Sequence, residues 1–215
     1  MPTRAVRRLL IALSLVAVGA AGQERRPLPL PAPRTDGGLP LMQALKARQS
    51  SREFDKRDLP LEVLSDMLWA AFGVNRPDSG RRTAPSAHNC QEIDIYVALC
   101  DGAFRYAPKE HHLVPVAPED VRVLTGTQDF VGQAPLNLVY VADFSKMGSE
   151  AEAEKIFLSA ADTGFIAQNV YLYCASAGLA TVVRAGVQRE ALAKKIGLRA
   201  DQRITLAQTV GYPKR

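Results

Sequence analysis

Two guanidinium groups and two hydroxyl groups fall within five consecutive residues in the segment Arg48-Gln49-Ser50-Ser51-Arg52. The planar fork of an arginine side chain matches the oxygens of a phosphate, and hydroxyl groups can add hydrogen bonds to the same anion. The segment is therefore a candidate phosphate-binding cradle. A charged turn in contact with solvent is the alternative interpretation of the same residues.

A second candidate segment, Pro85-Ser86-Ala87-His88-Asn89-Cys90-Gln91, stands shortly before a β-rich run. Pro, Ser and Asn favour a tight turn. The amide side chains of Asn89 and Gln91 donate and accept, so they can bind backbone groups or the donor–acceptor edge of a heterocycle. Two alternatives stay open. Ser86 can instead cap a helix, and His88 is either a substrate contact or proton donor, or an ordinary surface histidine.

A third candidate segment, Asp162-Thr163-Gly164-Phe165-Ile166-Ala167-Gln168-Asn169, falls inside the longest predicted helix. Gly164 in a helix interior costs roughly 1 kcal/mol relative to alanine. Close approach of another helix is the usual compensation, so we expect a packing partner at this position. The apolar residues that follow are expected to be helix core: Val170, Leu172 and Cys174.

Hydrophobic periodicity predicts the elements that must position these segments. Helices are predicted over residues 41–49, 61–72, 119–124, 151–177 and 189–196. Strands are predicted over residues 93–99, 136–142, 180–185 and 204–210, with a turn at Asp101-Gly102 and a polar loop over residues 73–85. The run over residues 136–142 is apolar throughout, which is typical of a strand buried on both faces. Helices and strands are mixed without a βαβ repeat, so the sequence predicts a layered α+β domain.

The composition is that of one globular domain, with 215 residues of which 47% are hydrophobic and 23% charged. No basic stripe interleaved with aromatic residues is present, so nucleic-acid binding is not expected. The three cysteines form no CxxC pair, which argues against a zinc or thioredoxin-type site. We expect them to be small buried hydrophobic residues, with one disulfide as the alternative. The sequence shows no Ser-His-Asp set, carboxylate pair or metal-binding cluster.

The first residues resemble a secretory leader. Arg4, Arg7 and Arg8 precede a short apolar run over residues 9–21, and the net charge of +5 falls to +2 without these arginines. The run is shorter than the ~20 residues that span a bilayer. We therefore expect cleavage near Ala20-Ala21-Gly22, or at residues 18–20, rather than a retained membrane anchor. The adjacent arginines also resemble a twin-arginine export signal.

This organisation predicts three parts: a signal peptide over residues 1–22, a proline-rich tether over 23–40 and the domain over 41–215. Prolines at alternate positions favour an extended chain, which suits a spacer between the export signal and the domain. The protein is accordingly expected to be exported and periplasmic.

Taken in order, the three candidate segments resemble the nitroreductase family of flavoproteins. The family pattern reads R-x-S-x-R-x-F, then P-S-x-x-N-x-Q, then D-x-G-x-x-x-Q-N ending in G-L. Here these stand as RQSSREF, PSAHNCQ and DTGFIAQN followed by AGL, and the resemblance covers residues 41–214. The stretches RTAPSAHNCQEIDIYV and QDFVGQAPLNLVYVAD are similar to the compact branch that includes SagB-type dehydrogenases.

The resemblance implies a mostly antiparallel sheet flanked by helices, in a homodimer with flavin mononucleotide (FMN) at the subunit interface. The phosphate and ribityl chain would be held by Arg48, Ser50, Arg52 and Lys214. The other subunit would contribute Pro85, Ser86, Ala87 and Asn89 against the flavin ring. Thr127 and Gln128 would bind the pyrimidine edge. The backbone of a segment containing Val183, Ala185 and Gly186 would face flavin N5, with Ala185 at a position where many relatives carry Glu.

The predicted function is that of an FMN-dependent oxidoreductase that transfers hydride or electron pairs through N5 to a small nitro, quinone or heterocyclic substrate. One alternative is a SagB-like dehydrogenase that oxidises a heterocycle or peptide. A flavin-binding or flavin-delivery protein without a substrate of its own is another, and an exported binding module that lost its cofactor is a third. Export would remove the protein from NADH and NADPH, so a quinone or redox partner is the expected electron donor.

Overall fold

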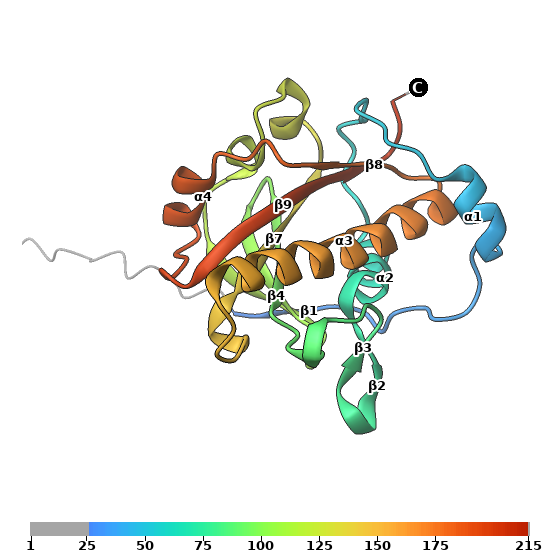
Figure 1. Ribbon diagram of the computed structural model, residues 1–215. Helices are drawn as coiled ribbons and strands as arrows, with labels where there is room; N and C mark the ends of the chain where they lie inside the picture. Colours follow the sequence, from blue (N-terminus) through green and yellow to red (C-terminus); the bar gives the residue numbers. More distant parts are fainter. Residues whose placement is uncertain (1–25, 215) are drawn as a thin grey trace, which may run out of the picture.

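The computed structural model describes residues 26–214 (Figure 1). The predicted signal peptide lies outside the described residues. The large sheet contains β1 (Leu28–Pro29), β4 (Ile93–Leu99), β5 (Gly102–Ala107), β6 (His112–Ala117), β7 (Leu136–Asp143), β8 (Ala180–Arg184) and β9 (Gln202–Gly211). Its strand order is β1-β6-β5-β4-β7-β9-β8, and every neighbouring pair is antiparallel. This confirms the predicted α+β fold with a mainly antiparallel sheet.

Four α-helices flank the sheet in the described part of the chain: α1 (Leu41–Ala47), α2 (Leu61–Phe72), α3 (Glu152–Ala177) and α4 (Arg189–Lys195). A separate hairpin is formed by β2 (Val74–Arg76) and β3 (Arg81–Arg82). Short 3-10 turns are η1 (Pro77–Ser79), η2 (Ala87–Asn89), η3 (Arg122–Thr125), η4 (Asp129–Gly132) and η5 (Phe144–Lys146).

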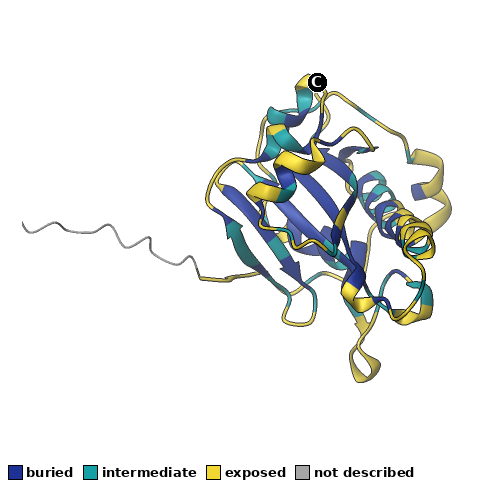
Figure 2. Ribbon diagram, turned by 60° about the vertical axis from the view of Figure 1, so that its left-hand side comes forward, coloured by how far each residue is buried: buried dark blue, intermediate teal, exposed yellow. Residues whose placement is uncertain are grey.

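Both faces of the central strand β7 are buried, as its continuous apolar run predicts. Leu138 and Tyr140 point into a core shared with α2 and α3, whereas Val139 and Val141 point into a second core shared with α4. The strands at the centre of the sheet are accordingly mostly dark blue in Figure 2, whereas β1, β6 and the β2–β3 hairpin are less buried. Because the two faces of the sheet are covered, only its edges and the connecting loops can present functional groups.

Helix α3 crosses the sheet beside α2 and buries only one of its sides (Figures 1 and 2). Ile166 and Val170 are fully buried against the sheet. The helix ends at Gly178, whose φ of 68° is left-handed and so favours glycine, as its predicted position after the helix requires. Gly164 is exposed, and nothing lies within 4 Å of the position its Cβ would take. No element within residues 26–214 therefore supplies the packing partner expected there.

Two predicted elements differ from the structure. The helix expected over residues 119–124 is the 3-10 turn η3, because the carboxylate of Asp120 accepts the Arg122 backbone N–H at 2.9 Å and holds its guanidinium. Such a side-chain contact competes with helix formation. The loop expected over residues 73–85 contains the β2–β3 hairpin, which turns at Gly80 with φ of 62°.

The proline-rich segment is not held away from the domain, although it was predicted as a tether. Leu28 and Pro29 pair with β6, and Leu30 is buried in the main core. The Arg34 guanidinium forms an ion pair with the buried carboxylate of Asp66 at 2.8 Å. The extended backbone that the prolines favour suits this role, because an extended chain can pair along the edge of a sheet.

No helix within residues 26–214 is long and apolar enough to cross a membrane. In the same part of the chain the three cysteines are unpaired: Cys174 is buried, Cys90 is partly buried and Cys100 is exposed.

Packing of the proline-rich segment predicts that Leu30→Ala lowers the free energy of unfolding by about 2–3 kcal/mol, because it leaves a cavity in the core. Leu28→Ala is the matched control, since Leu28 is 39% exposed, and should cost less than ~0.5 kcal/mol. Urea unfolding measures both. Equal and negligible effects would show that the segment is a free tether after all.

Candidate functional site

The predicted cradle, residues 48–52, lies between the C-terminal part of α3 and the edge strand β8. Helix α1 ends at Ala47 because Arg48 adopts extended backbone angles. The Ser51 N–H then donates to the Thr181 carbonyl at 2.9 Å, so this segment runs along the outer edge of β8. Arg52 is exposed, and Arg48 lies with its guanidinium carbon 5.4 Å from the centre of a tyrosine ring in α3.

That ring belongs to Tyr171, which the sequence did not single out. Its hydroxyl accepts the Val183 N–H at 3.0 Å and shares a hydrogen bond of 2.8 Å with the Ser50 hydroxyl. Tyr171 thus joins α3, β8 and the cradle. In the sequence it is one aromatic residue in a helix of mixed character, and nothing in its spacing distinguishes it from core. Because its hydroxyl occupies the Val183 N–H, that donor is not free for a ligand, which differs from the role predicted for Val183.

The open end of β8 presents the other predicted backbone groups. Ala185 and Gly186 are exposed just beyond the strand. A Cβ placed on Gly186 would lie 3.2 Å from the Thr127 hydroxyl, so the loop containing Thr127 and the exposed Gln128 borders this strand end. The fold therefore brings together the segments around Thr127 and Gly186, which are more than fifty residues apart in the sequence. Both were predicted to contact the flavin ring.

Arg184 points inward between these groups and is only 5% exposed. Its Nη1 donates to the Thr125 carbonyl at 2.6 Å, and its Nη2 donates to Asn137 Oδ1 and Thr209 Oγ1, both at 2.9 Å. Burial without a carboxylate partner lowers the pKa of Arg184 to about 10. Its guanidinium cannot reach a surface phosphate. Instead it fixes the loop before Thr127, and a side chain on Gly126 would clash with Nη1.

Lys214 lies beside the cradle. Its backbone N–H donates to the Glu53 carbonyl at 3.3 Å, and Phe54 forms a β-bridge with Pro213. Lys214, the last described residue, is therefore bonded to the residue that follows Arg52 in the sequence. This position suits the predicted contribution of Lys214 to the same anion site. Nearby, Gln49 and Ser51 line a cavity of about 260 Å³, whereas Arg48, Ser50 and Arg52 do not.

The second predicted segment, residues 85–91, lies elsewhere. The Ala87 N–H donates to the Asp162 carboxylate at 2.8 Å, and the Ser86 hydroxyl accepts the Gln91 N–H at 2.9 Å rather than capping a helix. Asp162 precedes Tyr171 by nine residues on α3, or roughly 13–14 Å along the helix axis. One chain therefore does not bring Pro85, Ser86, Ala87 and Asn89 next to the cradle.

Backbone strain is concentrated in that second segment. His88, Asn89 and Gln91 have φ of 51°, 55° and 49°, a left-handed region that non-glycine residues rarely adopt. Such strain persists only where surrounding contacts impose it, and it clusters at binding sites. Asn89 and His88 are exposed, so this strained loop presents polar groups to the outside of the subunit.

His111 is held by hydrogen bonds within the protein. His111 is hydrogen-bonded through Nδ1 to the Tyr106 hydroxyl at 2.9 Å and through Nε2 to Ser65 Oγ at 2.7 Å, and burial lowers its pKa. Within residues 26–214 no group of three or more potential metal ligands is found.

Comparisons with known proteins agree on one family. The model of the Nitroreductase family matches residues 45–212. A protein of Methanocaldococcus jannaschii whose name assigns it to the nitroreductases is 32% identical over 154 residues, covering 67% of this chain and 77% of that protein. The crystal structure of a protein from Ralstonia eutropha JMP134, also described by that family name, has a TM-score of 0.85 at 44% identity, with 100% of both chains covered.

A more distant likeness is one of fold alone. A chain of the Escherichia coli microcin synthetase McbBCD complex has a TM-score of 0.70 at 21% identity, over 97% of this chain and 85% of that one.

The inward position of Arg184 predicts that Arg184→Ala lowers the free energy of unfolding by about 3–5 kcal/mol, because it removes three buried hydrogen bonds, including the one to the Thr125 carbonyl, and leaves a cavity. Arg189→Ala is the control. Arg189 is exposed and donates to the carbonyls of Ile204 and Thr205, so its loss should cost less than ~1 kcal/mol. Denaturant unfolding compares the two variants. An Arg184→Ala protein as stable as Arg189→Ala would refute the structural role.

Proposed function

The chain belongs to the nitroreductase family of oxidoreductases, and from this premise we propose that it binds FMN and exchanges hydride or electron pairs with a small organic substrate. The observation that carries the proposal is the arrangement along the outer edge of β8, where cations without acidic partners lie beside the strand and exposed residues, Ala185 and Gly186, lie just beyond its end. Bound FMN would supply the redox chemistry at N5, and the protein would bind and orient it.

The cations of the cradle fit a phosphate. Within residues 26–214 neither Arg48 nor Arg52 forms an ion pair, although the structure contains seven such pairs elsewhere. Lys214 lies beside them. Three neighbouring positive charges repel one another unless an anion is present, and arginine forks bind phosphate oxygens well. Ser50, already bonded to Tyr171, would add a hydroxyl contact to the ribityl chain.

The strand end fits the flavin ring. Ala185 and Gly186 are exposed residues just past the end of β8, which has no neighbouring strand on its outer side. A donor at such a position stabilises negative charge that develops on a ring nitrogen. Thr127 borders the same strand end and can bind the polar edge of the ring. Only backbone groups are required at position 185, so alanine serves there as well as glutamate.

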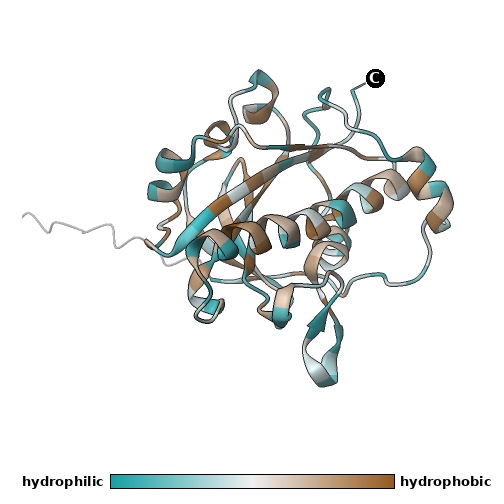
Figure 3. Cartoon of the chain, in the orientation of Figure 1, coloured by the Kyte–Doolittle hydropathy of each residue, from teal (hydrophilic) through white to brown (hydrophobic). Residues whose placement is uncertain are grey.

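The remaining ring contacts are proposed to come from a second copy of the chain. Large apolar side chains are exposed along α1 and α3: Leu41, Met42, Leu45, Phe157 and Phe165. Both helices carry hydrophobic stretches in Figure 3. The open position at Gly164 lies on the same exposed side of α3. A homodimer would cover this surface and could carry the strained loop, residues 85–91, of each subunit to the cradle of the other.

If the cradle binds the FMN phosphate, the double substitution Arg48→Ala/Arg52→Ala should weaken FMN binding by at least about a hundredfold, since each charge-assisted bond contributes roughly 1.5–3 kcal/mol. Lys194→Ala/Lys195→Ala removes the same charge from exposed positions on α4 and should leave binding unchanged. Flavin absorbance of purified protein and fluorescence titration with FMN measure the effect. Normal occupancy in the arginine variant would place the phosphate elsewhere.

Mixing two variants tests whether each FMN site takes residues from both subunits. Asn89→Ala alone and the double-arginine variant alone should each bind FMN poorly. A heterodimer containing one of each has one intact site, because that site takes its arginines from one chain and Asn89 from the other. Half of the wild-type flavin content is therefore expected. If both segments serve the same subunit's site, no flavin is recovered.

The choice of electron donor depends on where the protein is located. We propose that it lies in the periplasm after export and cleavage of the leader. NADH and NADPH are not maintained there, so the donor would be a quinol, a redox partner or a reduced small molecule. A SagB-like oxidation of a heterocycle or peptide is the alternative direction of the same chemistry. A flavin-delivery protein would hold FMN and show no turnover in either direction.

We expect slow steady-state oxidation of NADH and NADPH and faster exchange with quinols, by protein recovered from the periplasmic fraction without its leader. Mass spectrometry of the mature protein locates the cleavage site. Photochemical reduction of the bound flavin is the control that the cofactor itself is redox-active. Rapid NADPH turnover by uncleaved protein confined to the cytoplasm would contradict both the location and the donor.

A further inference from the structure

Glu92 is a fully buried carboxyl group that forms no ion pair within residues 26–214. It follows the strained loop directly and precedes β4. Its residue exposure is 0%, and neither carboxyl oxygen has a hydrogen-bond partner within the described part of the chain. Its backbone carbonyl accepts the Asp143 N–H at 3.0 Å, which ties the start of β4 to the end of β7. A buried carboxylate without a partner would strongly destabilise the fold, so Glu92 is expected to be protonated.

The carboxyl of Asp162 on α3 interacts with that of Glu92 and belongs to a residue that is only 3% exposed. Its Oδ2 accepts the Ala87 N–H at 2.8 Å, a contact that favours the charged carboxylate. Spacing in the sequence does not indicate this pair, because Glu92 and Asp162 are distant in the chain and meet only where the loop packs on α3.

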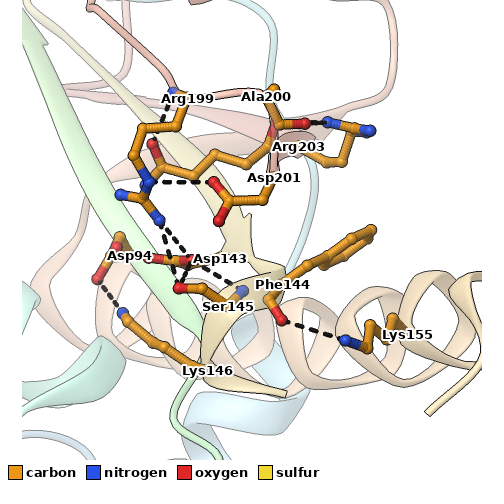
Figure 4. A network of polar contacts seen from close by, with 11 residues as sticks. Asp94, Asp143, Phe144, Ser145, Lys146, Lys155, Arg199, Ala200, Asp201 and Arg203 are labelled. Atoms are coloured by element: carbon orange, nitrogen blue, oxygen red, sulfur yellow. Dashed lines mark hydrogen bonds and ion pairs between the residues drawn. The ribbon is translucent and has the colours of Figure 1, made fainter. Parts of the chain in front are cut away.

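The nearby cations do not neutralise Glu92. Lys146 of η5 lies on this side of the sheet, but its Nζ binds Asp94 Oδ1 at 2.8 Å (Figure 4). Lys155 of α3 donates to the carbonyls of Phe144 and Gly148 instead. The other titratable groups that act on this region are Cys90 and Glu150, and burial raises the pKa of the Cys90 thiol.

We propose that Glu92 and Asp162 together hold one proton, and that this carboxyl pair positions the strained loop, residues 85–91, for its contact with the flavin. Two carboxyl groups that share a buried site cannot both ionise cheaply, so one keeps its proton. Burial, reinforced by the Asp162 charge, raises the pKa of Glu92 to about 7. Glu92 is thus the neutral member below about pH 7, and the Asp162 carboxylate is the member that accepts the Ala87 N–H.

The pair is suited to positioning because it anchors the loop where the backbone is most strained. His88, Asn89 and Gln91 all adopt left-handed angles within four residues, and the Ala87–Asp162 bond ties the start of this run to α3. A second ionisation would repel Asp162 from Glu92 and weaken that bond. The role at the flavin rests on the proposed function, whereas the shared proton does not.

The sign of the pH effect follows from the raised pKa. Between the ordinary pKa of 4.5 and about 7 the folded protein binds more protons than the unfolded chain. Stability from Glu92 is therefore complete at low pH and is lost as pH rises through about 7. Glu92→Gln keeps the shape, holds no titrating proton and removes this dependence.

The experiment compares wild type, Glu92→Gln and the control Glu190→Gln, an exposed glutamate on α4. From pH 5 to pH 8 the Tm of Glu92→Gln should rise relative to wild type by about 5 °C or more, whereas the control should follow wild type. Infrared spectra should show the band of a protonated carboxyl at pH 6 in wild type and in the control, and not in Glu92→Gln. Parallel Tm profiles, or no such band in wild type, would overturn the shared proton.

The positioning role has its own readout. FMN affinity of wild type should fall about tenfold per pH unit above the Glu92 pKa, and hydrogen exchange in residues 83–91, corrected for its intrinsic rate, should increase over the same range. Glu92→Gln should abolish both pH dependences. If Glu92→Gln showed the same pH dependence of FMN affinity and of hydrogen exchange as wild type, the pair would have no positioning role. A protein that binds no FMN would refute the proposed function, and the Tm and infrared results would still decide the shared proton.

Discussion

Hydrogen bonding along the outer edge of β8 is the constraint on which the candidate site depends. As the last strand of the sheet, β8 has one side without a neighbouring strand, and unpaired backbone groups there must bind something else or water. Ser51 and Tyr171 satisfy the groups of Thr181 and Val183. These two contacts fix the cradle and α3 against the strand. Beyond them the edge is open, so Ala185 and Gly186 remain exposed to a ligand.

Charge is distributed in a way that ordinary packing does not require. The cradle gathers cations without acidic partners, Arg184 is buried among neutral acceptors, and the buried Glu92 carboxyl lies against a second carboxyl, that of Asp162. Each arrangement is costly in isolation, because buried ions lose hydration and like charges repel. All three lie in segments that hold or border the proposed flavin contacts, which is where a fold tolerates such costs for function.

Helix α3 relates the two halves of the site. Tyr171, near its C-terminal part, contacts the cradle, and Asp162, more than two turns earlier, holds the strained loop. A straight helix keeps these two contacts apart within one subunit. The same helix leaves Gly164 and Phe165 exposed between them. Pairing of two α3 helices through this surface would bring the loop of one subunit toward the cradle of the other, which is how one rigid element can serve two sites.

The sequence by itself determined the elements whose pattern is local. The apolar period of α2, the continuous apolar run of β7 and the glycine after α3 each predicted an observed element. The residue types of the cradle likewise indicated an anion site. Only the tertiary structure decided that residues 28–40 pack on the domain, that Tyr171 bridges the cradle to β8, and that Glu92 meets Asp162. Helix and strand periodicity reflects interactions within a few residues, whereas burial and hydrogen-bond pairing depend on which distant segments the fold places side by side.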